Sequence, residues 1–151
     1  MSVLGELQPN KVFKYFEEIC SIPHGSRNLQ QISDYLVDFA KAHELKCRQD
    51  EDLNVIIWKD GSKGYEASEP VILQGHMDMV AVKEADCDKD MEKEGLDLEI
   101  NGDYISAKGT SLGGDDGIAV AYTLAVLDDE EMAHPPIEAI FTVNELSLIH
   151  I

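Results

Sequence analysis

The sequence predicts an α/β fold in which a mixed β-sheet lies between helical layers. Apolar residues recur at helical spacing in segments 11–19 and 29–44, whereas short apolar runs at 55–58, 71–74 and 137–143 are typical of strands. Helical and strand patterns alternate along the chain, as expected when helices flank a sheet. A length of 151 residues suits one domain.

Two amphipathic helices are expected first. The apolar face of segment 11–19 comprises Val12, Phe13, Phe16 and Ile19. The apolar face of segment 29–44 comprises Leu29, Ile32, Leu36 and Phe39. Ser26 or Asn28 is expected to cap the second helix. Because each helix has a single apolar stripe, we expect both to pack on a shared sheet.

The predicted strands differ in the way they end. The run 55–58 closes in Lys59-Asp60-Gly61, which is a turn signal. The run 71–74 begins with three consecutive apolar residues, a pattern that favours a strand covered on both faces. The last run, 137–143, follows a pair of prolines and is expected to be another core strand.

A hairpin, a charged excursion and a third helix are expected between the last two of these strands. Asn101-Gly102 separates segments 96–100 and 104–107 and has the favoured composition of a tight hairpin turn. Segment 83–94 is strongly charged, so we expect it to be solvated. Segment 118–127 is rich in small and apolar residues, which predicts a largely buried helix.

The charge and cysteine content exclude several classes of protein. Thirty acidic residues against twelve basic ones give a formal net charge of −18, which opposes binding to nucleic acid or to an anionic membrane surface. Cys20, Cys47 and Cys87 are widely spaced and odd in number, which disfavours a disulfide framework or a thiolate zinc site. No signal-peptide pattern and no apolar run of roughly 20 residues is found, so we expect a cytoplasmic protein.

Ionisable residues follow predicted strands or a glycine-rich turn at three places. His76 and Asp78 come directly after one strand, Asp115 and Asp116 precede the third helix, and Glu145 follows the last strand. Because ligands of α/β proteins bind beyond the carboxyl ends of the strands, we expect these side chains to lie close together.

His76-x-Asp78 suits a metal site, because a ligating imidazole needs its second nitrogen held by a nearby acceptor. Zinc is the metal favoured by mixed histidine and carboxylate ligands, with manganese or cobalt as substitutes. Asp115 suits a carboxylate that bridges two ions, and Glu145 suits a general base. Other interpretations stay open: His76 as a hydrogen-bonded buried histidine, and Asp115 or Asp116 as a cap of the following helix.

Three motifs resemble those of a known family. GHMDMV at 75–80, GTSLGGDDGIAVA at 109–121 and HPPIEAIFTVNE at 134–145 are similar to the aminoacyl-histidine dipeptidases, also called cytosolic non-specific dipeptidases. These enzymes belong to the dinuclear zinc peptidases. The resemblance covers residues 1–145, with the motifs in the order and at the separations of the family.

The resemblance implies a role for most of the candidate residues. His76 matches a ligand of one zinc, Asp78 the acid that orients it, Asp115 the bridging carboxylate and Glu145 the general base. Asp116 is expected to have no catalytic role. The implied cofactors are two divalent ions, and the implied reaction is hydrolysis of dipeptides, including Xaa-His dipeptides. The full-length protein is expected to be a homodimer.

The resemblance stops after Glu145. The family continues there with a second glutamate that binds the other zinc, whereas this chain has Leu146 and then Ser-Leu-Ile-His-Ile. We therefore expect residues 1–145 to be the N-terminal part of a metallopeptidase catalytic domain and residues 146–151 to be foreign to it. The 151-residue chain itself is then expected to be inactive.

Two alternatives to a dipeptidase remain. The first is a related hydrolase that acts on N-acyl amino acids or on longer peptides. The second is a protein that keeps the fold without catalysis and serves for binding or assembly.

Overall fold

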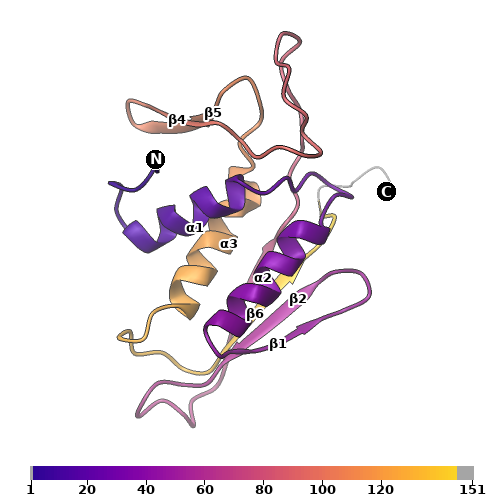
Figure 1. The fold of residues 1–151 in the computed structure, drawn as a ribbon. Coiled ribbons are helices and arrows are strands. Elements are labelled where there is room, and N and C mark those ends of the chain that lie inside the picture. The colour runs from indigo at the N-terminus through magenta and orange to yellow at the C-terminus, as the bar shows by residue number, and fades with distance from the viewer. Residues whose placement is uncertain (1, 146–151) are drawn as a thin grey trace.

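The computed structural model describes residues 2–145 of the chain, which form three helices and six strands. In chain order these are α1 (Asn10–Cys20), α2 (Gln30–Ala42), β1 (Lys46–Gln49), β2 (Val55–Lys59), β3 (Val71–His76), β4 (Leu98–Asn101), β5 (Tyr104–Ala107), α3 (Gly114–Leu127) and β6 (Ile137–Thr142). Figure 1 shows them as one body, with the β4–β5 hairpin apart from the main sheet. The predicted tail, residues 146–151, lies outside the described residues.

The main sheet is mixed and has the strand order β1-β2-β6-β3. β6 pairs antiparallel with β2 and parallel with β3, so the predicted α/β class with a mixed sheet is confirmed. The hairpin predicted around Asn101-Gly102 forms between β4 and β5. β1 is not predicted by the sequence, because its residues KCRQ are mostly polar and it lies at the sheet edge beside β2.

One face of the central strands is buried beneath the helices. The buried side chains of this face are Val55, Ile57, Ala139 and Phe141, which pair across β2 and β6. The side chains that alternate with them, Ile56, Trp58 and Ile140, are partly exposed. Within residues 2–145 the helices therefore cover a single face of the sheet, so only one of the two predicted helical layers is among the described residues.

β3 is the edge strand next to β6, and its first residues are exposed. Val71 retains 44% of its accessible surface and Ile72 retains 60%. The expectation that this strand is covered on both faces is wrong for these two residues, because both side chains remain exposed. Only Gly75 and His76, at the carboxyl end of the strand, are buried.

The first two helices pack differently from one another. α2 lies on β1 and β2, as expected, whereas α1 packs mainly against α3. Phe16 of α1 fits against Gly117 of α3, where an added Cβ would lie 3.3 Å from the phenyl ring. Tyr15 of α1 meets Phe39 of α2 edge to face, with ring centroids 5.5 Å apart. The three helices therefore share one apolar core.

The starts of α2 and α3 depart from the sequence-based expectation. α2 begins at Gln30 without a side-chain cap, so the expected capping by Ser26 or Asn28 is wrong. α3 is entered through Asp115 and Asp116, whose backbone angles are not helical and whose shared peptide bond is cis. No helix within residues 2–145 has the length and apolar character needed to cross a membrane.

Candidate metal centre

His76 stands at the carboxyl end of β3, level with Thr142 at the end of β6. Its ring is almost completely buried. Nδ1–H donates to the backbone carbonyl of Asp78 at 3.0 Å and lies 3.3 Å from Oδ1 of the same residue. The second ring nitrogen, Nε2, is thereby directed away from Asp78, in the orientation that a ligating histidine needs.

Asp115 and Glu145 both lie on the Nε2 side of this ring. Asp115 Oδ1 is 3.0 Å from Nε2, and Glu145 Oε2 is 3.9 Å from the same atom. Both carboxylates reach solvent, with side chains 83% and 54% exposed, whereas that of His76 is 8% exposed. The structure therefore brings together the four predicted residues, including Asp78, in one cluster that opens to solvent.

The surrounding carboxylates raise the pKa of His76. Burial by itself lowers this pKa, but the hydrogen bond to Asp115 and the bond to the Asp78 carbonyl outweigh burial. The negative charges of Asp78 and Asp116 act in the same direction. The Asp78 carbonyl can only accept, so Nδ1 carries a hydrogen in this arrangement.

Asp78 joins three segments of the chain. Its fully buried carboxylate accepts the Ser26 hydroxyl at 2.7 Å and the Glu145 backbone N–H at 3.0 Å, in addition to its approach to His76. From the sequence, Asp78 was expected only to orient His76, and Ser26 only to cap a helix. The placement of Ser26 could not be read from local sequence, because the two residues are 52 positions apart.

Asp116 contacts the main chain of His76 and not its ring. Its Oδ2 accepts the backbone N–H of His76 at 3.3 Å. Neither aspartate accepts a backbone N–H from α3 in the described hydrogen bonds, so the helix-cap interpretation is not supported. Two consecutive acids therefore contact one histidine, one at its ring and one at its main chain.

An imidazole nitrogen and a carboxylate oxygen at this spacing are suitable donors for a divalent ion. A cation bound there would compete with protonation of His76. Within the part of the chain that the structure describes, no group of three histidine, cysteine, aspartate or glutamate side chains is arranged to hold a metal. The described chain thus fits a metal as a source of two donors, not as a complete site.

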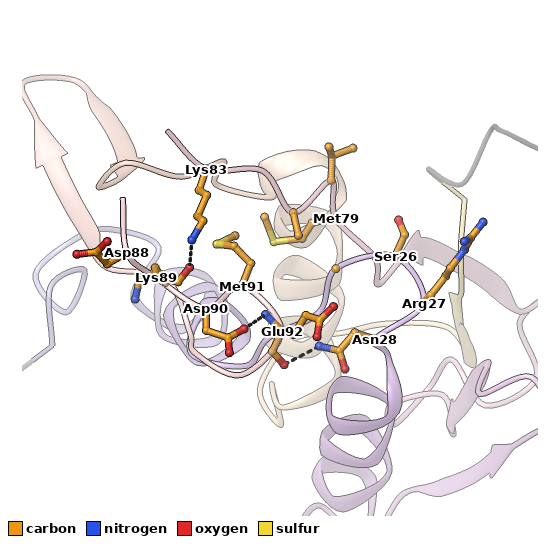
Figure 2. Close-up of a pocket in the computed structure, with 13 residues that line it drawn as sticks. Ser26, Arg27, Asn28, Met79, Lys83, Asp88, Lys89, Asp90, Met91 and Glu92 are labelled. Carbon is orange, nitrogen blue, oxygen red and sulfur yellow. Dashed lines mark hydrogen bonds between the residues drawn. The ribbon is translucent and has the colours of Figure 1, made fainter. Parts of the chain in front are cut away.

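A pocket of about 790 Å³ lies next to this cluster (Figure 2). Met79 and the loop 25–28 form one wall, and segment 88–92 forms another. Asn28 Nδ2 donates to the Glu92 carbonyl at 2.9 Å and so joins the two walls. Segment 83–94 is mostly exposed, as predicted, but it also lines this pocket, which its charged composition did not predict.

Comparison with known proteins identifies similar peptidases. No protein-family model matches the chain. It is 40% identical over 145 residues to the cytosol non-specific dipeptidase of Escherichia coli K12, covering 96% of this chain and 30% of that protein. It also matches the structure of aminoacylhistidine dipeptidase from Vibrio alginolyticus at 39% identity, with a TM-score of 0.91 over 94% of this chain and 29% of that one.

A tripeptidase from Staphylococcus aureus is more distant. It is 23% identical, with a TM-score of 0.73 over 95% of this chain and 38% of the tripeptidase, and it supports the fold alone. The resemblance predicted from the three motifs is confirmed by the two dipeptidases. Because the chain spans about 30% of the length of these relatives, it corresponds to less than a third of either.

Proposed function

We propose that the protein to which this chain belongs hydrolyses dipeptides, including Xaa-His dipeptides, in a metal-dependent reaction. The observation that carries the proposal is the contact of His76 Nε2 with Asp115 Oδ1, with Glu145 beside it at the carboxyl edge of the sheet. The similarity to two dipeptidases supports the choice of substrate class. Residues 1–145 would be the N-terminal part of the catalytic domain, and residues 146–151 would be foreign to it.

Each residue of the cluster would have a separate role in the reaction. His76 and Asp115 would hold two divalent ions, zinc by preference with manganese or cobalt as substitutes, and Asp115 would bridge them. Bound at this place, such ions polarise a carbonyl and lower the pKa of water. Glu145 would accept the proton of the attacking water, since its carboxylate is exposed and close to the same histidine nitrogen. Asp78 would keep Nδ1 occupied, so that Nε2 faces the ions.

The proposal includes partners and a location. Small dipeptides are the substrates, and the formal net charge of −18 argues against nucleic acid and membrane partners. We place the protein in the cytoplasm and expect the full-length form to be a homodimer.

The test compares two substrates with the full-length gene product. An Xaa-His dipeptide should be hydrolysed in the presence of zinc, and an N-acetyl amino acid should not. Substitutions His76→Ala and Asp115→Ala should each abolish hydrolysis, and Asp103→Asn at an exposed turn serves as the matched control. Preference for the N-acetyl amino acid would favour the related-hydrolase alternative.

A second candidate function is a non-catalytic protein that keeps the fold. It is favoured by one observation: only two metal donors meet within residues 2–145. Hydrolysis of an Xaa-His dipeptide by the full-length gene product separates the two, and calorimetric titration with zinc tests the 151-residue chain itself. Weak binding is expected from two donors, whereas tight binding of two ions would show that the tail supplies ligands.

A further inference from the structure

The main chain of His76 faces an open edge of the sheet. Along β3, the N–H of Val71 is bonded to Pro136 and the N–H of Met77 to Thr142, so odd-numbered donors point toward β6. Donors alternate in direction along a strand, and the N–H of His76 therefore points away from β6. Within residues 2–145, β3 has no strand on that side.

Asp116 fills the place of the absent strand. Its Oδ2 accepts the His76 N–H at 3.3 Å. Gly75 makes this approach possible, because a Cβ at that position would lie 3.1 Å from the same oxygen and 3.4 Å from the Cβ of Ala119. Gly75 thus leaves β3 without a side chain at the point where the Asp116 carboxylate lies.

Asp115 and Asp116 contact His76 at two different atoms. Asp115 Oδ1 lies 3.0 Å from the ring nitrogen Nε2, and Asp116 Oδ2 accepts the backbone N–H. Because the two acids are consecutive in the chain, a displacement of His76 along β3 would disturb the contacts of both. The relative position of the two metal donors is therefore set partly through the Asp116 side chain.

We infer that Asp116 is a positioning residue, which fixes the main chain of His76 and thereby the spacing of the donors His76 and Asp115. This inference rests on the proposed function, since it gives Asp116 a part in building the same metal centre. Asp116 would bind neither metal nor substrate. If the Asp116 carboxylate only stabilised the start of α3, its removal would lower the stability of the fold without any specific effect on His76.

The experiment uses the 15N-labelled 151-residue chain and two substitutions. Asp116→Ala removes the acceptor, whereas Asp116→Asn keeps an acceptor oxygen and removes the charge. Amide hydrogen exchange of His76 should accelerate about 10- to 100-fold in Asp116→Ala, because a hydrogen bond to a charged group is lost. Exchange at Met77, whose donor faces β6, is the internal control. Asp116→Asn should retain most of the protection.

Zinc affinity gives the second measurement, read from the His76 resonances during a titration with zinc alone. Asp116→Ala should weaken binding about 10- to 100-fold, as for other residues that support a ligand. Asp116→Asn should restore most of the affinity, and Asp103→Asn should match the parent chain.

Three outcomes would overturn the inference. Unchanged exchange at His76 in Asp116→Ala would mean that the carboxylate does not hold this amide. Faster exchange with unchanged zinc affinity would leave Asp116 a structural role only. If zinc fails to shift the His76 resonances even in the parent chain, His76 is not a metal donor in this chain and the inference fails, whereas the proposed function fails only if the full-length gene product does not hydrolyse the Xaa-His dipeptide.

Discussion

Replacement of Asp78 should weaken both the fold and the metal centre. The fully buried Asp78 carboxylate accepts from Ser26 and from the Glu145 backbone and lies 3.3 Å from the ring of His76. Asp78→Ala would leave the Ser26 hydroxyl and the Glu145 N–H without their acceptor, whereas His76 Nδ1 would keep the backbone carbonyl of residue 78. We expect Asp78→Asn to destabilise the fold less than Asp78→Ala, because the amide keeps one acceptor oxygen. Some loss remains, since the amide N–H groups would face the donor that the other oxygen accepted.

The magnitude follows from the number and charge of the bonds. A hydrogen bond to a charged group contributes about 1.5–3 kcal/mol, and the contributions of neighbours do not add fully. Breaking a buried ion pair on one side costs about 3–5 kcal/mol, which we take as the loss for Asp78→Ala. For Asp78→Asn we expect about 1–3 kcal/mol. Since small domains have only about 5–15 kcal/mol of stability, the alanine variant could unfold, and the asparagine variant keeps the test readable.

Urea unfolding followed by fluorescence measures these losses. Trp58 is the single tryptophan of the chain, and its indole N–H is bonded to Glu138 in the central sheet, so its signal reports on the sheet. Asp103→Asn, at the exposed β4–β5 turn, should change stability by less than about 0.5 kcal/mol. If both Asp78 variants unfold at the urea concentration of the parent, the inferred network does not hold the three segments together.

Three further predictions concern the surface, the histidines and the metal. Ile72→Lys on the exposed edge of β3 should reduce self-association in sedimentation experiments while changing stability by less than about 0.5 kcal/mol; unchanged association would refute it. NMR titration should give His24 a lower pKa than His76, since burial lowers the pKa of His24 and acceptors raise that of His76. Accordingly, protonation of His24 should destabilise the fold as pH falls below about 6.5. The stabilising effect of protonated His76 should be lost as pH rises through its raised pKa. If His76 titrated at a lower pH than His24, both expectations would be contradicted. Zinc affinity, measured by calorimetry, should fall about tenfold per pH unit below the His76 pKa, because the ion displaces one proton, and a pH-independent affinity would exclude this competition.

The sequence predicted the elements well where periodicity was strong. Both N-terminal helices, the hairpin at Asn101-Gly102 and three core strands occur within a few residues of their expected places. β1 was missed because its polar residues pair only at an edge and leave no alternating pattern. The exposure of Ile72 was missed for a related reason: an apolar run shows that a strand can be covered, but not whether another element covers it.

The sequence indicated which residues form the candidate site but not which contacts hold them in place. His76, Asp78 and Glu145 were selected because they follow predicted strands, and Asp115 because it lies at the glycine-rich turn before the third helix; the other three lie within 4 Å of the His76 ring. Asp116 was given no role, since the sequence places it beside Asp115 without indicating that its side chain turns toward β3. That direction depends on the space left by Gly75, which only the packed strand and helix reveal.

The topology explains why these distant residues meet at all. β3 and β6 are parallel neighbours, so the segments that follow them leave the sheet at the same edge. α3 lies between them in the chain and runs in the opposite direction. Its first residues lie against Gly75, at the carboxyl end of β3, and its last residues lie near Lys59, at the opposite end of the sheet strands. The start of α3 and the ends of both strands are therefore neighbours in any chain with this connection. Topology brings the residues within reach, and the contacts of His76 with Asp78 and Asp116 are those that we expect to hold Nε2 3.0 Å from Asp115.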